Sequence, residues 1–239
     1  MAGTSAHDEL LALAAHELRN PVTAIRGFAD TLLRGRDVLS AEQQDAALDA
    51  IARQAGRLDR LLGDLLLVAA GASGALALRP SDVALGPAID AAATDSGLPR
   101  DDVRVDCPAE LAVWADPDRL AQMLGNHLTN ARLHGRPPVT VEAEVVDGPG
   151  PAPGGVVEIR VGDAGDGVAD DLVPRLYGRF QRGSGPGGGR VAGSGLGLAV
   201  VRTLAEASGG SAGYRRGVDG AHCFLLRLPA PPRPTGPPR

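Results

Sequence analysis

His16 is equipped for covalent chemistry, because a neutral imidazole nitrogen is a nucleophile. Glu17 stands beside it, and a neighbouring carboxylate can accept a ring proton or hold the tautomer. The apolar residues around His16 repeat at spacings of three and four, which places the ring on the opposite, solvent-facing side of a helix. The plain alternative is a solvated surface histidine. A zinc-binding helix would need a second histidine where this sequence has Asn20, so zinc is excluded.

Asn126 and Asn130 lie one helical turn apart in the stretch 116–134. Two carboxamides at this spacing can ligate a hard cation and contact phosphate oxygens without adding negative charge. A solvated polar stripe would explain two asparagines equally well.

Asp163 ends an expected strand and is followed by Gly165 and Gly167. A carboxylate at a strand end, beside backbone without side chains, suits recognition of an exocyclic amine. The spacing alone is more often an ordinary turn.

Gly193, Gly195 and Gly197 open an expected helix. The free amides and the positive end of such a helix form an anion site, and glycine leaves room for a phosphate. The segment is not a Walker loop, because the chain contains no lysine. It is not a Rossmann fingerprint either, because it does not open a βαβ unit.

A helical hairpin must carry His16. The apolar repeat runs from residue 8 to residue 70, Gly35 can close the first helix, and Ser40 with Gln43 forms a capping box that can open the second. Each helix has an apolar seam, and together the seams expose more surface than one hairpin covers. We therefore expect a homodimer in which two hairpins form a four-helix bundle.

An α+β layer must carry the asparagines, Asp163 and the glycines, since short β-branched runs alternate there with helical stretches. The expected strands are 103–106, 111–115, 139–146, 156–161 and 222–228, and the expected helices are 87–94, 117–133 and 195–207. The apolar period fails at GASGALALRP, residues 71–80, which is predicted to be a short linker, and the proline-dense end is expected to be disordered.

The composition excludes several classes of protein. The net charge is −5, which gives no electrostatic reason to coat nucleic acid or an anionic bilayer. The two cysteines, Cys107 and Cys223, fit neither a disulfide scaffold nor a metal module. No stretch is apolar enough for a membrane helix, so no membrane contact is expected from this chain.

Five segments, in order, resemble the motifs of sensor histidine kinases of two-component systems. LLALAAHELRNPVTAIRGFADTLL resembles the phosphoacceptor helix, and NHLTNA resembles the N-box. VGDAGDGV resembles the D-x-G-x-G box, LYGRFQRG the F-box with Tyr177 in place of its first Phe, and GSGLGLAVV the second glycine box. They are spread in this order over roughly residues 8–229, so the resemblance extends over nearly the whole chain.

The resemblance implies roles for residues of the first helix. His16 would receive the phosphoryl group of ATP, Glu17 would be the general base, and Asn20 would position water if the protein also acts as a phosphatase. Related ATPases carry a glutamate at the first N-box position to activate water, whereas this chain has the amide of Asn126, which favours a kinase.

The resemblance also implies the nucleotide site. Asn126 and Asn130 would hold Mg²⁺ and the triphosphate, and Asp163 would bind adenine. The family has a basic residue where this chain has Leu133, and Arg132 and His134 flank that position. The remaining residues expected around the nucleotide and its phosphates are Gly165, Gly167, Arg179, Phe180, Arg182, Gly193, Gly195, Leu196 and Gly197.

The implied architecture is a dimerisation and phosphotransfer hairpin over residues 1–73, a Bergerat-type ATP-binding domain over 74–230 and a disordered tail over 231–239. That ATP-binding domain is a two-layer sandwich, a mixed sheet with helices on one face. The implied partners are a second copy of the chain and a response regulator that takes the phosphoryl group on an aspartate. The implied location is cytoplasmic, as a separate kinase or as part of a membrane-bound sensor. The alternatives are a serine-directed kinase or ATPase of the same nucleotide fold, and a dimeric adaptor whose ATP site has decayed.

Overall fold

The computed structural model describes residues 6–35, 38–146, 155–181, 194–217 and 221–232. The chain divides into two compact units, Met1–Ala69 and Ala70–Arg239. Nothing among the described residues is a helix long and apolar enough to cross a membrane.

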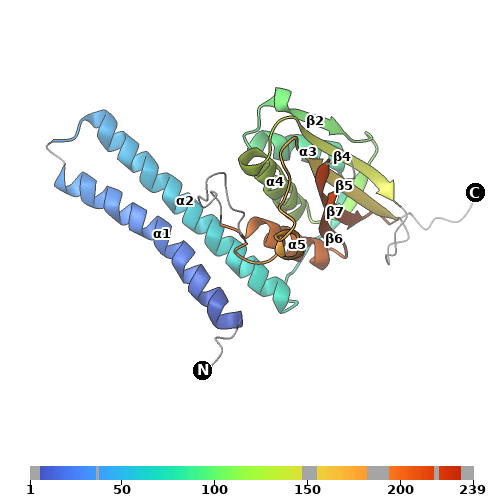
Figure 1. Ribbon diagram of the computed structural model, residues 1–239, viewed down its shortest axis with the longest axis horizontal. Helices are drawn as coiled ribbons and strands as arrows, with labels where there is room; N and C mark the ends of the chain where they lie inside the picture. Colours follow the sequence, from blue (N-terminus) through green and yellow to red (C-terminus); the bar gives the residue numbers. More distant parts are fainter. Residues whose placement is uncertain (1–5, 36–37, 147–154, 182–193, 218–220, 233–239) are drawn as a thin grey trace, which may run out of the picture. The chain divides into compact units, whose positions relative to one another are not determined.

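The first unit is a helical hairpin formed by α1 (Ala6–Arg34) and α2 (Ala41–Ala72), as predicted (Figure 1). α1 continues through Pro21 without interruption. The predicted capping box is present at the start of α2: the amide of Ser40 donates to Oε1 of Gln43 at 3.0 Å, and the amide of Gln43 donates to Oγ of Ser40 at 3.3 Å.

Large apolar side chains remain exposed along both helices of the hairpin. They are Leu13, Val22, Phe28, Leu33, Leu48, Leu62 and Leu66. One hairpin therefore leaves part of its apolar surface in contact with water, as the two seams predict.

The second unit is built on a five-stranded mixed sheet with the order β2-β4-β5-β7-β6 (Figure 1). The strands are β2 (Val103–Asp106), β4 (Val139–Val146), β5 (Val156–Gly162), β6 (Ser211–Arg216) and β7 (His222–Pro229). β2 pairs with β4 in parallel, and the other neighbours are antiparallel. Two further strands, β1 (Ser81–Ala84) and β3 (Ala112–Ala115), form a small antiparallel sheet of their own.

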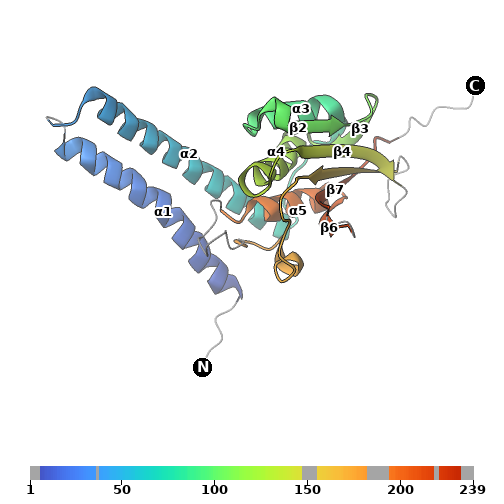
Figure 2. The same ribbon diagram turned by 45° about the horizontal axis from the view of Figure 1, so that its top comes forward.

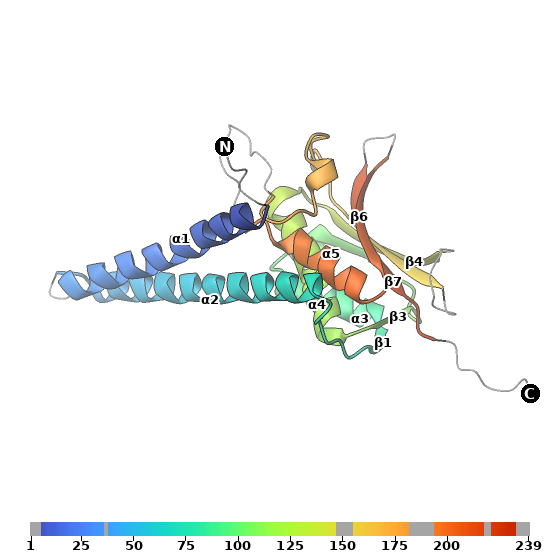
Figure 3. The same cartoon turned by 90° about the horizontal axis from the view of Figure 1, so that it is seen from below.

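Three helices cover one face of the large sheet: α3 (Leu85–Asp95), α4 (Pro117–His134) and α5 (Gly197–Ala207) (Figures 2 and 3). Alternate residues of each strand face these helices, so Val157, Ile159 and Val161 of β5 are fully buried. Leu120, Leu124 and similar residues of the helices complete the core. The predicted two-layer sandwich with helices on one face is confirmed.

The other face of the sheet carries an ion-pair network around Glu158, whose side chain is only 4% exposed. Arg160, Arg215 and Arg227 all lie within salt-bridge distance of its carboxylate. Burial acts to raise the pKa of Glu158, but hydrogen bonds from Arg227 and Arg160 outweigh it and keep the pKa below its usual value.

The predicted linker over 71–80 agrees with the structure apart from its first two residues, which still belong to α2. α2 continues to Ala72, β1 occupies Ser81–Ala84, and α3 begins at Leu85. β1 is too short to show a hydrophobic period. β6 was not predicted either, because Gly213 and the arginines at its end obscure the alternation expected of a strand.

Candidate functional site

α4 is anchored at its beginning by Asp116, the N-cap residue. Its carboxylate accepts hydrogen bonds from the amides of Asp118 at 3.1 Å and Arg119 at 3.3 Å, and from that of Arg79 at 2.9 Å. These amides hold the pKa of Asp116 below its usual value despite the opposing effect of partial burial. The helix is therefore fixed at its start, ten residues before Asn126.

Asn126 lies where α4 meets the beginning of α5. A Cβ atom added to Gly197, the first residue of α5, would lie 3.4 Å from Oδ1 of Asn126, so glycine lets the two approach closely. Nδ2 of Asn126 is buried and has no hydrogen-bond partner among the described residues. An unpaired buried amide beside a helix N-terminus is the arrangement that an anionic ligand would satisfy.

Asn130 lies one turn further along α4 and is half-buried. Arg132, Leu133 and His134 follow it in the last turn, and all three are exposed. Arg132 and His134 therefore both reach the surface, although burial lowers the pKa of His134, and Leu133 is 40% exposed.

Asp163 directly follows β5, and its side chain is 6% exposed. Its Oδ1 accepts hydrogen bonds from the backbone amides of Gly165 at 2.7 Å and Arg136 at 3.2 Å. Its Oδ2 lies 3.3 Å from Nε2 of His222 on β7. The carboxylate is thus held at both oxygens by atoms from three separate parts of the chain.

Glycine is required around this carboxylate. A Cβ atom at Gly135, directly after α4, would lie 2.4 Å from Cγ of Asp163, and one at Gly165 would lie 2.7 Å from its Oδ1. The sequence motif predicted Gly165 at the site. It gave no indication of Gly135, because the close approach joins residues that are far apart in the chain.

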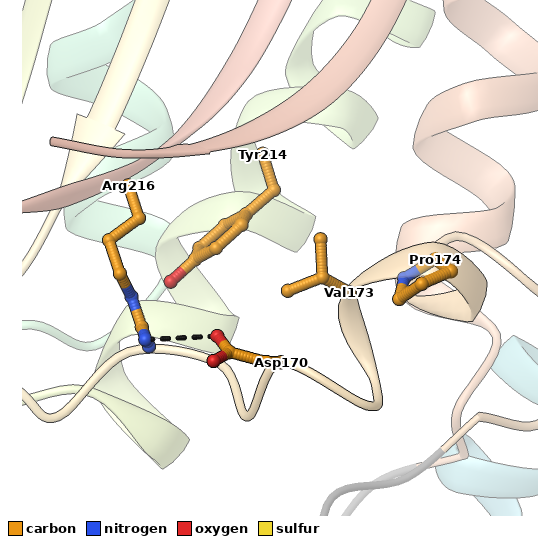
Figure 4. A pocket seen from close by; sticks show the side chains of 5 residues that line it. All are labelled: Asp170, Val173, Pro174, Tyr214 and Arg216. Carbon is orange, nitrogen blue, oxygen red and sulfur yellow. Dashed lines mark hydrogen bonds and ion pairs between the residues drawn. The ribbon is translucent and has the colours of Figure 1, made fainter.

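The loop after Asp163 is fastened to β6. Gly167 has a positive φ of 73°, and the next amide, that of Val168, donates to the hydroxyl of Tyr214 at 2.9 Å. Arg216 donates to the carbonyl of Val168 at 2.7 Å and to Asp170 at 3.2 Å. Tyr214, Arg216 and Asp170 line an open pocket of about 270 Å³ together with Val173 and Pro174. Figure 4 shows these five side chains.

The segment after this loop contains the aromatic residues of the F-box resemblance. Tyr177 is buried and donates a hydrogen bond to the carbonyl of Gly213. Arg179 and Phe180 are half-buried, and Phe180 adopts a positive φ of 58°, which is strained for a residue with a side chain. A Cβ atom at Gly195 would lie 2.9 Å from Cα of Phe180, so Gly195 and Phe180 approach closely.

Two predicted site residues, Arg182 and Gly193, lie outside the described residues. The side chain of Leu196 is fully buried, so only its backbone is available to a ligand. No three His, Cys, Asp or Glu side chains gather to hold a metal within the described ranges. A metal at this site would therefore depend on carboxamides and on oxygens of the ligand itself.

His16, Glu17 and Asn20 lie on α1, in the other unit. His16 and Asn20 are exposed and stand one turn apart on the same face, whereas Glu17 is buried. The imidazole ring is thus accessible, as the apolar period predicts.

Two side chains near Asp163 are not among the site residues that the motifs indicate. His222 and Tyr214 meet the D-x-G-x-G loop through the pairing of β6 with β7. No motif places either residue beside Asp163, so only the fold brings them there.

Two protein families match this chain. The family described as His Kinase A (phospho-acceptor) domain matches residues 6–74. The family described as Histidine kinase-, DNA gyrase B-, and HSP90-like ATPase matches residues 115–232.

Individual proteins are similar as well. Sensor histidine kinase TrcS of Mycobacterium tuberculosis is 34% identical over 223 residues, which cover 90% of this chain and 42% of TrcS. Sensor histidine kinase component HK1 of the same organism is 38% identical over 133 residues, covering 56% of this chain and 74% of HK1. The crystal structure of full-length ShkA in complex with AMPPNP aligns with a TM-score of 0.60 and 27% identity, covering 93% of this chain and 46% of ShkA. The chain thus spans less than half the length of TrcS and ShkA.

Proposed function

Since the chain belongs to the sensor histidine kinase family, we propose that it transfers the γ-phosphoryl group of ATP to a ring nitrogen of His16. The hairpin of residues 1–73 would present the acceptor, residues 74–230 would bind the nucleotide, and 231–239 would be a tail without a role in the reaction. The observation that carries the proposal is the unpaired buried amide of Asn126 beside the start of α5.

An amide at this position supports a kinase over a hydrolase. Asn126 can contact phosphate oxygens, but a carboxamide is not a base at neutral pH and cannot activate water. Transfer therefore needs a base at the acceptor, and Glu17 is the residue next to His16.

Asp163 would select the base of the nucleotide by accepting a hydrogen bond from its amino group. The carboxylate is buried and already oriented by backbone amides, so little reorganisation is needed when adenine binds. Gly165 and Gly167 keep the adjacent backbone free of side chains, and Phe180 would border the nucleotide.

The triphosphate would lie between α4 and the N-terminus of α5. Amides at Gly195, Leu196 and Gly197 offer the positive helix end. The cationic candidates are Arg132, Arg179 and Arg182, and His134 would be a hydrogen-bond donor because burial lowers its pKa. Asn126 and Asn130 would hold a Mg²⁺ ion through their carboxamide oxygens, and such an ion neutralises charge on the triphosphate.

At the acceptor, a lone pair of the His16 ring forms the new N–P bond while the bond from phosphorus to the ADP oxygen breaks. The ring proton passes to the carboxylate of Glu17. The exposure of His16 gives a nucleotide-binding unit access to the ring.

We also propose the partners. The exposed apolar side chains of α1 and α2 support a homodimer through the hairpin. A response regulator would take the phosphoryl group from His16 onto an aspartate, and Asn20, one turn from His16, would position water for a phosphatase reaction. A chain that uses ATP in this way would act in the cytoplasm, either as a separate kinase or as part of a membrane-bound sensor.

The test is incubation of the full chain with γ-labelled ATP and Mg²⁺. The wild type is expected to acquire acid-labile label, whereas His16→Gln and Asn130→Ala acquire none. Acid-stable label on serine, or label that survives His16→Gln, would replace the proposal with a serine-directed kinase. ATP hydrolysis without any label would indicate an ATPase. Failure to bind ATP at millimolar concentration would indicate an adaptor.

A further inference from the structure

His222 is a buried polar residue at the nucleotide site to which no role has yet been given. Its side chain is 3% exposed, and Nε2 lies 3.3 Å from Oδ2 of Asp163. His222 occupies the first position of β7, opposite Arg216 on β6. Its ring centroid lies 6.0 Å from that of Tyr214, whose hydroxyl accepts the hydrogen bond from the amide of Val168. The imidazole is therefore fixed between an aromatic ring and the carboxylate.

A second buried histidine gives a useful contrast. His127 on α4 is also fully buried, but neither of its ring nitrogens has a hydrogen-bond partner among the described residues. His127 contacts Phe224 and acts as a packing residue. His222 differs because one of its nitrogens is directed at the carboxylate of the site.

The two carboxylate oxygens of Asp163 differ in how many hydrogen-bond partners they have. Oδ1 already accepts two backbone hydrogen bonds, from Gly165 and Arg136, which use both of its lone pairs. Oδ2 therefore remains to accept a hydrogen bond from a ligand. If Nε2–H of His222 donates to one lone pair of Oδ2, the carboxylate cannot rotate. The second lone pair of Oδ2 then points in a fixed direction.

We propose that His222 is a positioning residue for adenine recognition: Nε2–H donates to Oδ2 of Asp163 and fixes the carboxylate so that it accepts a hydrogen bond from the 6-amino group of the base. This inference rests on the proposed function, in which Asp163 binds adenine. The histidine acts through Asp163 and not on the phosphoryl transfer itself.

The test compares two nucleotides that differ at one group. Binding of ATP and of purine riboside triphosphate, which lacks the 6-amino group, is measured by titration calorimetry on the full chain. The proteins are the wild type, His222→Ala, His222→Gln and Asp163→Asn. His222→Ala is expected to weaken ATP binding roughly tenfold, the lower end of the range for a hydrogen bond to a charged group, and to change binding of the analogue less than about twofold.

The variants separate positioning from structural damage. Gln carries an amide N–H that can reach Oδ2, so His222→Gln is expected to retain most of the ATP affinity. In a chain that already carries Asp163→Asn, adding His222→Ala should cause no further loss. Equal weakening of both nucleotides by His222→Ala, or no weakening of ATP binding, would overturn the inference and leave the proposed function intact. A wild type that binds both nucleotides equally would instead refute adenine recognition by Asp163, and one that binds neither would refute the proposed function.

Discussion

Replacing His127 with leucine should stabilise the nucleotide-binding unit and remove a pH dependence from its unfolding. The ring of His127 is completely buried, and burial lowers its pKa from 6.5 to about 4. Both ring nitrogens lack hydrogen-bond partners among the described residues. A buried group left unpaired costs about 1–3 kcal/mol, so His127→Leu should raise the free energy of unfolding by about that amount at pH 7.5.

The pH dependence has a definite sign. The folded state keeps the ring neutral, whereas the unfolded chain takes up a proton as the pH falls through 6.5. Stability that is fully present above pH 6.5 is therefore lost between pH 6.5 and about 4. One pKa unit corresponds to about 1.4 kcal/mol. The difference between a pKa of 6.5 and one of about 4 therefore amounts to a loss of about 3 kcal/mol. The advantage of His127→Leu should grow by that amount across the same window.

Urea unfolding from pH 4 to 8, followed by the fluorescence of Trp114, measures the difference directly. Trp114 is the only tryptophan of the chain and lies on β3 of the same unit. Subtracting the wild-type curve from the variant curve removes the contribution of the carboxylates, which titrate in both proteins. His16→Gln is the control, because His16 lies on α1 in the other unit and the variant should leave the unfolding curve of the unit that carries Trp114 unchanged. If the free energies of unfolding of the variant and the wild type differ by the same amount at every pH, His127 does not cause the pH dependence. If His127→Leu is less stable than the wild type at pH 7.5, the buried ring does not destabilise the unit.

Three further changes test other parts of the structure. Gly135→Ala would place a Cβ atom 2.4 Å from Cγ of Asp163, so ATP binding should weaken roughly tenfold or more by calorimetry. An unchanged affinity would show that the close contact between Gly135 and Asp163 is not needed for ATP binding. Glu158→Gln leaves three arginines without their shared carboxylate and should lower the free energy of unfolding by about 1–3 kcal/mol, measured in urea. Because the pKa of Glu158 is lowered, its contribution to the free energy of unfolding should be present above the ordinary glutamate pKa of 4.5 and be lost as the pH falls below it. If the wild type stays more stable than Glu158→Gln in acid, the ion-pair network is not the cause. Ser40→Ala should cost the hairpin about 1 kcal/mol in thermal unfolding followed by circular dichroism, and an unchanged midpoint would show that the capping box is not needed.

The sequence predicts those parts of the fold that depend on local pattern. The predicted strand over 139–146 coincides with β4, and the predicted helix over 117–133 ends one residue before α4 does. β6 was missed because it is an edge strand that pairs on one side only, and pairing there does not require a regular apolar alternation.

Motif spacing predicted Asp163 and Gly165, which the fold places in contact through a hydrogen bond of 2.7 Å. Gly135 and His222 were not predicted. His222 is 59 residues away from Asp163 in the chain, so its approach is decided by strand pairing and not by any local sequence signal.

The central proposal is that His16 receives the γ-phosphoryl group of ATP. Mass-spectrometric mapping tests it most directly, on peptides kept at neutral to alkaline pH after incubation of the full chain with ATP and Mg²⁺. We expect one phosphoryl group on the peptide that contains His16, and none in the Asn130→Ala variant. A phosphoryl group on a serine, a threonine or another histidine, with His16 unmodified, would contradict it.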